Sequence, residues 1–369
     1  MTLTSWIDKK LSLYTKQKRY RSTNPVMAKD MLNFASNDYL CLSTHPHVQE
    51  ASRTAVERYG CSARSSRLVS GTLEIHEQLE FELAKFLGFQ TATLFGSGFL
   101  ANLGVISAIT SRKDAIFEDR LNHASLIDGA RITGARVHRY VHNDLNDLEE
   151  KLQKSCEPGK KIIITDALFS MDGDIAPLKE LSELAQKYNA TLIVDEAHSI
   201  GVFGKGLCHQ LGVRPDIVIG TFAKALGGYG GFALGSTAVQ SLLINRSRPL
   251  IYSTAPPPAC CAAALAALHI LEQRPEMGKT LLTRANYFSL LLLGKKSTSQ
   301  IIPLIVNCND KALHLSSALS KKGIISTAIR PPTVPVNTAR LRFSIYLNHS
   351  ETTLRKAAQT ILETLKEVP

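Results

Sequence analysis

The feature that most constrains the fold is a regular alternation of short apolar runs and helical patterns between residues 91 and 220. Helical patterns such as PLKELSELAQKY (177–188) separate several of the runs. Strands that alternate with helices predict a mostly parallel sheet covered by helices on both faces. The predicted strands are TATLF (91–95), AIF (115–117), VHRYV (137–141), KIIIT (161–165), TLIVD (191–195) and DIVIG (216–220).

This alternation weakens after about residue 255, which predicts a second, smaller domain. Two helical stretches (259–272 and 276–292) lead into the apolar run IIPLIV (301–306). A strand and a helix then end the chain, as an α+β domain would. With 369 residues, the chain is long enough for two cores. We expect an α/β protein divided into a segment 1–45, a large domain 46–258 and a small domain 259–369.

The strand near the C-terminus, TARLRFSIYL (338–347), alternates between apolar and polar residues. Such a pattern predicts a half-buried strand with Arg340 and Arg342 together on its polar face. Ser350 follows as the expected N-cap of a final helix, which turns Leu354 and Ile361 toward the core.

The formal charge of +11 is partly concentrated in a basic, amphipathic helix expected between residue 1 and about residue 22. We interpret most of its basic residues as a solvated surface, and the alternative is that they attract an anionic partner. No recognised nucleic-acid motif is present, so we expect no nucleic-acid partner. No stretch predicts a signal peptide or a membrane span.

Seven cysteines are scattered through the chain, and none of them has the spacing of metal ligands. An odd number of dispersed cysteines in a large chain favours reduced thiols and a cytoplasmic location. We therefore expect neither disulfides nor a metal site.

A lysine follows the last predicted strand in the segment PDIVIGTFAKALGGYGG (215–231). Lysines are usually solvated surface charges, and Lys224 alone fits that interpretation. However, it lies just past the carboxyl end of a strand, where ligands bind in open α/β sheets, and the glycines after it leave room for a ligand. A lysine there is able to bond covalently to an aldehyde cofactor.

The segment GSGFLA (96–101) matches the dinucleotide fingerprint GxGxx[GA]. Because it does not lie in the first βα unit, a dehydrogenase is the weakest alternative. The spacing supports a phosphate cradle of backbone N–H groups at a helix N-terminus, although a glycine turn without a ligand gives the same pattern. DEAH (195–198) resembles a helicase box, but no GxxxxGK[ST] loop accompanies it, so we reject an NTPase.

Asp195 and Lys224 follow adjacent predicted strands and are able to meet across one cofactor. Pyridoxal phosphate needs a lysine for its aldehyde, an acid for its ring nitrogen and a phosphate cradle. His198 is placed to hydrogen-bond the phenolic oxygen, and His123 to stack on the ring. Each histidine alone is explained as a structural hydrogen-bonder, but the convergence of these groups favours function.

Several long segments resemble the α-oxoamine synthase family of fold-type I pyridoxal phosphate enzymes. The resemblance runs from FASNDYL (34–40) to the C-terminal strand, and its motifs are specific. Its main segments are FGSGFLAN (95–102), DRLNHASLIDG (119–129), LFSMDGD (168–174), VDEAHSIGVFG (194–204) and TFAKALGG (221–228).

Within this family, other segments resemble most closely the members that act in biotin biosynthesis. Those members condense L-alanine with a pimeloyl thioester of coenzyme A or of an acyl carrier protein, with loss of CO2. The segments are VHNDL (141–145), LIYSTAPPP (250–258) and IRPPTVPVNTARLRFS (329–344). The resemblance implies pyridoxal 5'-phosphate as cofactor and a cytoplasmic homodimer whose active site lies between the subunits. Ser253 and Thr254 are our candidates for residues that cross into the neighbouring site.

The resemblance also implies a role for individual residues. Lys224 would bond to the cofactor, Asp195 would bind the pyridine nitrogen and His198 the phenolic oxygen, and His123 would stack on the ring. The remaining cofactor contacts would come from Gly98, Phe99, Ser170 and Thr221. The substrate contacts would come from Asn37 and Arg342 for the α-carboxylate, with His123 nearby, and from Arg21 and Thr333 for the acyl group. Arg340 shares the strand face of Arg342 and is an alternative to it.

Two positions depart from the family pattern. Ala63 and Arg64 stand where a glycine-rich run is usual, and Ala223 replaces a glycine before the lysine. Neither change removes a catalytic group. Glycine C-acetyltransferase and 5-aminolevulinate synthase share the cofactor residues and remain alternatives. A non-catalytic partner subunit is the alternative outside enzymes, and the presence of Lys224 argues against it.

Overall fold

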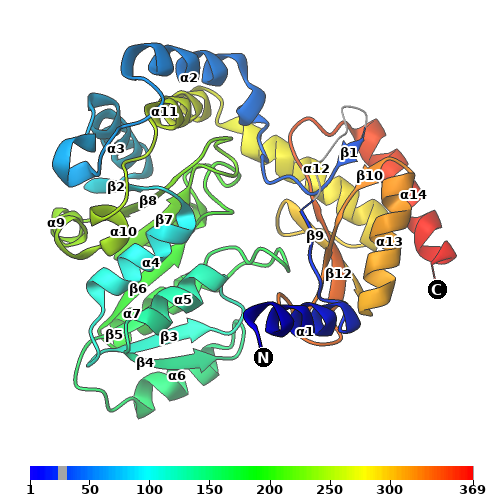
Figure 1. The fold of residues 1–369 in the computed structure, drawn as a ribbon, viewed down its shortest axis with the longest axis horizontal. Coiled ribbons are helices and arrows are strands. Elements are labelled where there is room, and N and C mark those ends of the chain that lie inside the picture. The colour runs from blue at the N-terminus through cyan, green and yellow to red at the C-terminus, as the bar shows by residue number, and fades with distance from the viewer. Residues whose placement is uncertain (24–30, 369) are drawn as a thin grey trace.

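The computed structural model describes residues 1–23 and 31–368, which form two lobes (Figure 1). The larger lobe holds a seven-stranded sheet and the helices around it. The smaller lobe holds the C-terminal elements, together with helix α1 (Leu3–Lys16) and strand β1 (Leu32–Asn33) from the start of the chain. Helix α12 (Glu276–Leu293) leads from the larger lobe into the smaller one.

The large sheet is mostly parallel, as predicted. Its strands are β2 (Thr91–Phe95), β3 (Ala115–Asp119), β4 (Arg136–Tyr140), β5 (Lys161–Asp166), β6 (Ala190–Asp195), β7 (Ile217–Thr221) and β8 (Gly231–Gly235). Their order is β2-β8-β7-β6-β5-β3-β4. Strands β7, β6, β5, β3 and β4 run parallel, whereas β8 is antiparallel to both of its neighbours.

Strand β8 is the one strand of this sheet that the sequence analysis did not predict. Its sequence, GFALG, has glycine at both ends and looks like a turn, because glycine weakens strands. The structure explains the first glycine: a Cβ at Gly231 would lie 2.5 Å from the backbone nitrogen of Gly98. Close approach between β8 and the turn after β2 therefore requires glycine there.

Helices cover both faces of the sheet. Successive strand residues point to opposite sides, so a strand of apolar residues has apolar side chains to bury on each face. Ile162 and Ile164 of β5 join a core beneath α4, α5, α9 and α10, whereas Ile163 joins a core beneath α6, α7 and α8. Burying one such side chain contributes roughly 1.5–3 kcal/mol. The helices are α4 (Gly98–Ile109), α5 (Ala124–Ile132), α6 (Leu145–Lys154), α7 (Leu178–Lys187), α8 (Leu207–Leu211), α9 (Thr237–Arg246) and α10 (Arg248–Ile251).

A third group of helices packs at the β2 end of the large lobe (Figure 1). Helix α3 ends at Gly88, whose φ of 77° is the left-handed geometry predicted for a helix stop. The helices of this group are α2 (Pro46–Tyr59), α3 (Glu74–Leu87) and α11 (Pro258–Gln273), with a 3₁₀ turn η1 (Leu42–Thr44) and a π turn η2 (Arg67–Gly71).

The small lobe contains a three-stranded antiparallel sheet, β11-β12-β9, and a two-stranded parallel sheet of β1 and β10. The Oγ of Ser350 accepts a hydrogen bond from the Thr353 amide at 3.1 Å, so the predicted N-cap of the final helix is confirmed. The elements are β9 (Ile301–Asn307), β10 (Ile324–Ile325), β11 (Thr327–Ile329), β12 (Ala339–Ser344), α13 (Asn309–Lys321) and α14 (Glu351–Glu367).

Strand β12 corrects one prediction. All six of its residues are buried, including Arg340 and Arg342, so the strand is not half-exposed to solvent. Its polar face is covered because both arginines bond to residues of the segment 170–172 in the large lobe. Alternation of apolar and polar residues in the sequence predicts that one face of a strand is polar. It does not predict whether that face contacts water or another lobe of the protein.

The N-terminal helix is shorter than predicted, since α1 ends at Lys16, and none of its residues is buried. All seven cysteines carry free thiols. Within residues 1–23 and 31–368, no helix is long and apolar enough to cross a membrane. The same residues contain no cluster of His, Cys, Asp or Glu suited to a metal ion. The division at residues 45 and 258 stays a proposal.

Candidate active site

The predicted site lies at the carboxyl ends of adjacent parallel strands. Asp195 is the last residue of β6, and Lys224 follows the end of β7 by three residues. Asp166, the last residue of β5, is the register partner of Asp195. The carboxyl ends of parallel strands share one edge of the sheet, so topology brings these groups together.

Lys224 is half-buried and electrostatically coupled to the rest of the site. Burial lowers the pKa of its amine to about 8, although the negative charges of Asp195 and Asp166 oppose that shift. With this pKa about a tenth of the amine is neutral at pH 7, far more than for a lysine of ordinary basicity, and a nucleophile or proton carrier needs that neutral form.

Asp195 is buried and held at both carboxylate oxygens. Its Oδ1 accepts from the Ala197 amide at 2.8 Å, and its Oδ2 accepts from Nδ2 of Asn102 at 2.7 Å. Asp166 lies alongside, and burial together with the charge of Asp195 raises the pKa of Asp166 well above its usual range. The arrangement keeps one carboxylate at a fixed angle beside a second acid that resists ionisation.

His198 is buried and joined to the small lobe through Tyr39. The Nδ1 of His198 lies 2.7 Å from the Tyr39 hydroxyl oxygen. Burial lowers the pKa of His198 well below its usual value, and the charges of Lys224 and Arg342 act in the same direction. The Tyr39 hydroxyl also donates to Oδ1 of Asn37 at 3.1 Å, so His198, Tyr39 and Asn37 form one hydrogen-bonded chain between the two lobes.

Arg342, rather than Arg340, faces the predicted substrate position. Its Nη2 donates to Oδ1 of Asn37 at 3.2 Å and to the Tyr39 hydroxyl at 3.1 Å, and its Nε donates to the Ser170 carbonyl at 2.6 Å. Arg340 instead pairs with Asp172 and donates to the Met171 carbonyl. Of the two arginines, Arg342 is therefore the one whose guanidinium bonds to Asn37.

His123 is the N-cap residue of α5 and its side chain is exposed, as that of a residue that covers a ligand would be. The Nδ1 of His123 lies 2.7 Å from the Ser125 hydroxyl, and its backbone N–H donates to Oδ2 of Asp166 at 2.7 Å. Desolvation lowers the pKa of His123 below its usual value and the charge of Lys224 adds to that effect, although the charge of Asp195 opposes it. The ring is therefore neutral at physiological pH.

The turn between β2 and α4 forms a compact cradle. Ser97 caps α4 by accepting from the Leu100 amide at 3.1 Å, which leaves the first N–H groups of the helix turned outward. A Cβ at Gly98 would lie 3.1 Å from the Cβ of Thr221. Phe99 is exposed and meets the ring of His123 edge-on, with centroids 6.4 Å apart. A phosphate at this helix N-terminus fits the donors present.

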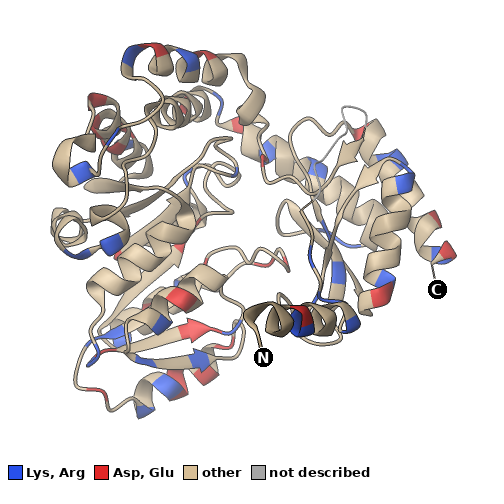
Figure 2. Ribbon diagram, viewed as in Figure 1, with Lys and Arg blue, Asp and Glu red and all other residues tan. Residues whose placement is uncertain are grey.

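The two residues assigned to the acyl substrate also meet, although they are 312 positions apart. Nη2 of Arg21 donates to Oγ1 of Thr333 at 2.9 Å, and both side chains are exposed. Figure 2 shows further Lys and Arg residues on the neighbouring helix α1. This part of the molecule is therefore basic and open.

The departure from the family's glycines has a visible local consequence. Arg64 has a φ of 66°, in the left-handed region that favours glycine, while Ala63 is buried. A non-glycine residue there costs of order 1 kcal/mol. The segment that follows bridges Ser66 to Thr254, beside our candidate Ser253, and presents the exposed apolar side chains of Leu68 and Val69.

Four polar residues at the centre of the site were not predicted from the sequence. They are Tyr39, Asn102, Asp166 and Ser125. A polar residue directly after an apolar strand was the signal available for Asp166. No comparable signal marks Asn102, which lies inside an apolar helical run, because its role depends on how two helices pack.

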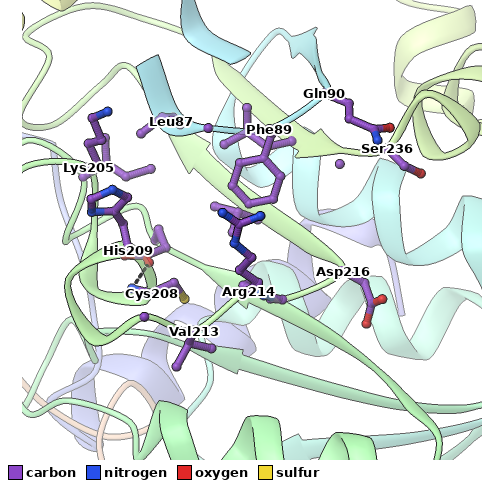
Figure 3. A pocket seen from close by; sticks show the side chains of 18 residues that line it. Leu87, Phe89, Gln90, Lys205, Cys208, His209, Val213, Arg214, Asp216 and Ser236 are labelled. Carbon is purple, nitrogen blue, oxygen red and sulfur yellow. Dashed lines mark hydrogen bonds between the residues drawn. The ribbon is translucent and has the colours of Figure 1, made fainter. Parts of the chain in front are cut away.

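A separate cavity of about 480 Å³ contains none of the predicted site residues (Figure 3). Lys205 and His209 lie at one end of it, and Gln90 and Ser236 at the other. Asp216 precedes β7 and also lines this cavity, so that wall lies at the strand starts, away from Lys224.

Comparisons with known proteins cover nearly the whole chain. A sequence profile of the family described as aminotransferase class I and II matches residues 29–361. An 8-amino-7-oxononanoate synthase from Saccharophagus degradans is 41% identical over 391 residues, covering 100% of this chain and 98% of the relative.

Two solved structures are similar as well. One is an 8-amino-7-oxononanoate synthase from Francisella tularensis, with 31% identity, a TM-score of 0.79, and coverage of 92% of this chain and 99% of that one. The other is a serine palmitoyltransferase from S. paucimobilis with a bound PLP–myriocin adduct. It has 27% identity, a TM-score of 0.94, and coverage of 100% and 99%.

Proposed function

The chain belongs to the aminotransferase class I and II family, and from that premise we propose that it catalyses the 8-amino-7-oxononanoate synthase reaction. L-alanine and a pimeloyl thioester condense, with release of CO2 and the free thiol. The observation that carries the proposal is the convergence of Lys224, Asp195 and His198 at one edge of the large sheet with Arg342 from strand β12 of the small lobe.

The cofactor is pyridoxal 5'-phosphate, which when bound supplies an aldehyde for amines and a ring that withdraws electrons from the substrate α-carbon. The residues present fit this group. The Lys224 amine is partly neutral, the α4 N-terminus beside Thr221 offers phosphate donors, and Asp195 is fixed as a carboxylate for the ring nitrogen.

The chain's own residues then divide the work. Arg342 and Asn37 bind the carboxylate of alanine, for which a forked guanidinium suits better than an ammonium. The Lys224 amine takes the proton from the alanine α-carbon and later returns one to the product. The α-carbon bonds to the thioester carbonyl carbon, the C–S bond breaks, and the carboxylate leaves as CO2.

Arg21 and Thr333 support binding of the acyl donor at the open end of the site, where the basic surface favours an anionic thioester. The donor is a thioester of coenzyme A or of a carrier protein. Free thiols throughout the chain are consistent with the predicted cytoplasmic location.

The direct experiment begins with an absorbance scan of the purified protein and continues with L-alanine and pimeloyl thioester. We expect a cofactor band that changes when L-alanine is added, followed by release of thiol and CO2. Glycine with acetyl or succinyl donors is the matched comparison, because it tests the two alternative synthases. Higher turnover with glycine, or a protein that never binds the cofactor, contradicts the proposal.

We also propose that the chain forms a homodimer. The exposed pair Leu68 and Val69 lies on a segment tied to Thr254, and α1 has no buried residue within the described chain, so both have apolar surface for a second copy to cover. Sedimentation velocity should show a species of about twice the 40.4 kDa chain mass. A monomer at micromolar concentration contradicts this proposal.

A further inference from the structure

Two buried polar residues connect Asp195 with His123. Nδ2 of Asn102 donates both to Oδ2 of Asp195 at 2.7 Å and to Oγ of Ser125 at 2.8 Å. The same Ser125 oxygen lies 2.7 Å from Nδ1 of His123. Asn102 is 1% exposed and Ser125 is not exposed at all, so this relay is shielded from water.

Helix packing holds the relay in place. Asn102 and Ile106 lie one turn apart on α4, and Ser125 and Gly129 lie one turn apart on α5. A Cβ at Gly129 would lie 2.9 Å from Cδ1 of Ile106 and 3.3 Å from the Asn102 carbonyl oxygen. Glycine at this position therefore allows the close approach that brings Ser125 within reach of Asn102.

The amide orientation of Asn102 follows from the charge of Asp195. A flipped amide would turn its oxygen toward the carboxylate, where the two would repel each other, so the NH2 group must face Asp195. Both amide hydrogens are then used, and within the described residues Oδ1 of Asn102 has no partner. A buried amide that leaves its oxygen unbonded is held there by its two donated bonds.

The proton positions on Ser125 and His123 follow from the same hydrogen bonds. The Ser125 oxygen accepts from Asn102, so its own hydrogen is available for Nδ1 of His123. The Ser125 backbone N–H also points to that Nδ1, at 3.3 Å. A ring nitrogen that accepts two donors carries no proton, and a neutral ring must then hold its proton on Nε2.

We propose that Asn102 and Ser125 are positioning residues that fix His123 as the Nε2–H tautomer and tie its orientation to the Asp195 carboxylate. His123 then presents a donor, rather than an acceptor, on the exposed side of its ring. The proposal deepens the proposed function, on which it rests for the reaction that this donor serves. The tautomer itself does not depend on the identity of either substrate.

The first test is ¹⁵N NMR of the cofactor-loaded protein labelled at histidine, without substrate, near pH 8. His123→Gln identifies the His123 signals among the 11 histidines. We expect an unprotonated Nδ1 and a protonated Nε2 in the parent protein. In Ser125→Ala only the backbone N–H of residue 125 still donates to Nδ1, so we expect a smaller difference between the two ¹⁵N shifts. A protonated Nδ1 in the parent, or unchanged shifts in Ser125→Ala, overturns the proposal.

The second test is a double-mutant cycle on turnover. Asn102→Ala removes a hydrogen bond to a charged group and should lower kcat about 10- to 100-fold, with a smaller change in KM for alanine. Because one relay runs through both residues, Asn102→Ala with Ser125→Ala should be no slower than Asn102→Ala alone. Effects that multiply would show two independent residues and would overturn the relay.

Ser107→Ala is the matched control. Its hydroxyl bonds to the Leu103 carbonyl within α4 and reaches neither Asp195 nor α5, so kcat and the NMR shifts should stay unchanged. Thermal melting of each variant separates loss of folding from loss of the relay. If the protein binds its cofactor but does not make the proposed product, the NMR result still decides the tautomer, so the two proposals fail separately.

Discussion

The two ends of the candidate site are built in different ways. At the cofactor end, Asp195 is the last residue of β6 and His198 lies three residues beyond it. Both are buried, and each is held by hydrogen bonds to other buried groups. At the acyl end, Arg21 and Thr333 are exposed and meet through a single hydrogen bond. Helix α1, which precedes Arg21, has no buried residue.

This difference follows from where the residues lie in the chain. The cofactor end follows from the topology of the sheet, because the last residues of all parallel strands lie at the same edge. The acyl end joins the first segment of the chain to a loop near its end, and each residue there loses conformational freedom for few contacts. We infer that the cofactor end is set before ligands arrive, whereas the acyl end gains order from the donor or a second copy.

The largest expected effect is loss of the amine at the cofactor end. Lys224→Ala should abolish turnover and the absorbance of the covalently attached cofactor, because no other described amine shares the coupling to Asp195 and Asp166. Lys205→Ala is the matched control, since this exposed lysine follows the neighbouring strand β6 and lines the separate cavity instead. Retained turnover in Lys224→Ala would remove the central assignment of the site.

The second effect separates two arginines on one strand. Arg342→Lys should raise KM for alanine about 10- to 100-fold, because an ammonium cannot reproduce the forked contact with a carboxylate. Arg340→Lys changes an arginine that pairs with Asp172 instead, so it should lower the melting temperature and leave KM nearly unchanged. Equal changes in KM for both variants would mean that the polar face of β12 acts as a whole.

The sequence predicted those features of the fold and the site that depend on residues close together in the chain. The apolar runs predicted every strand of the large sheet except β8, whose glycines serve contact with Gly98 rather than strand propensity. Lys224 and Asp195 were found because strand ends collect at one edge. The choice between Arg340 and Arg342 was left open, since both share one face and only the packing of the two lobes separates them.

The residues that were missed all act across elements. Tyr39 joins His198 to Arg342 from a segment with almost no regular structure, and Asn102 joins two helices inside an apolar run. Periodicity places Asn102 on a helix, but only the approach of α5 at Gly129 gives its side chain a partner. Such residues are specified by packing, which one sequence does not display.

A third effect concerns pH at the cofactor end. After the cofactor is removed, the rate of its covalent return should depend on the neutral fraction of Lys224, because only the neutral amine attacks an aldehyde. With a pKa lowered by burial to about 8, that rate should rise roughly tenfold per pH unit below pH 8 and level off above it. Stopped-flow absorbance between pH 6 and about 9.5 measures this. A rate that still rises steeply above pH 9 would show a lysine of ordinary basicity.

The smallest effect is expected at the acyl end, where the contacts are exposed. Arg21→Ala should raise KM for the acyl donor roughly two- to fivefold and leave KM for alanine unchanged, because an exposed charged contact contributes at most about 1 kcal/mol. Arg19→Ala is the matched control, since Arg19 lies two residues before Arg21 in the same basic segment and bonds locally to Gln17.

KM for the donor should also rise with salt in the parent protein and less so in Arg21→Ala, because salt screens exposed charges beyond about 8–10 Å. A donor KM that ignores both salt and Arg21 would assign this basic surface to solvation alone. The acyl end would then have to be built by residues from elsewhere, and the contrast between the two ends would be sharper than the single chain suggests.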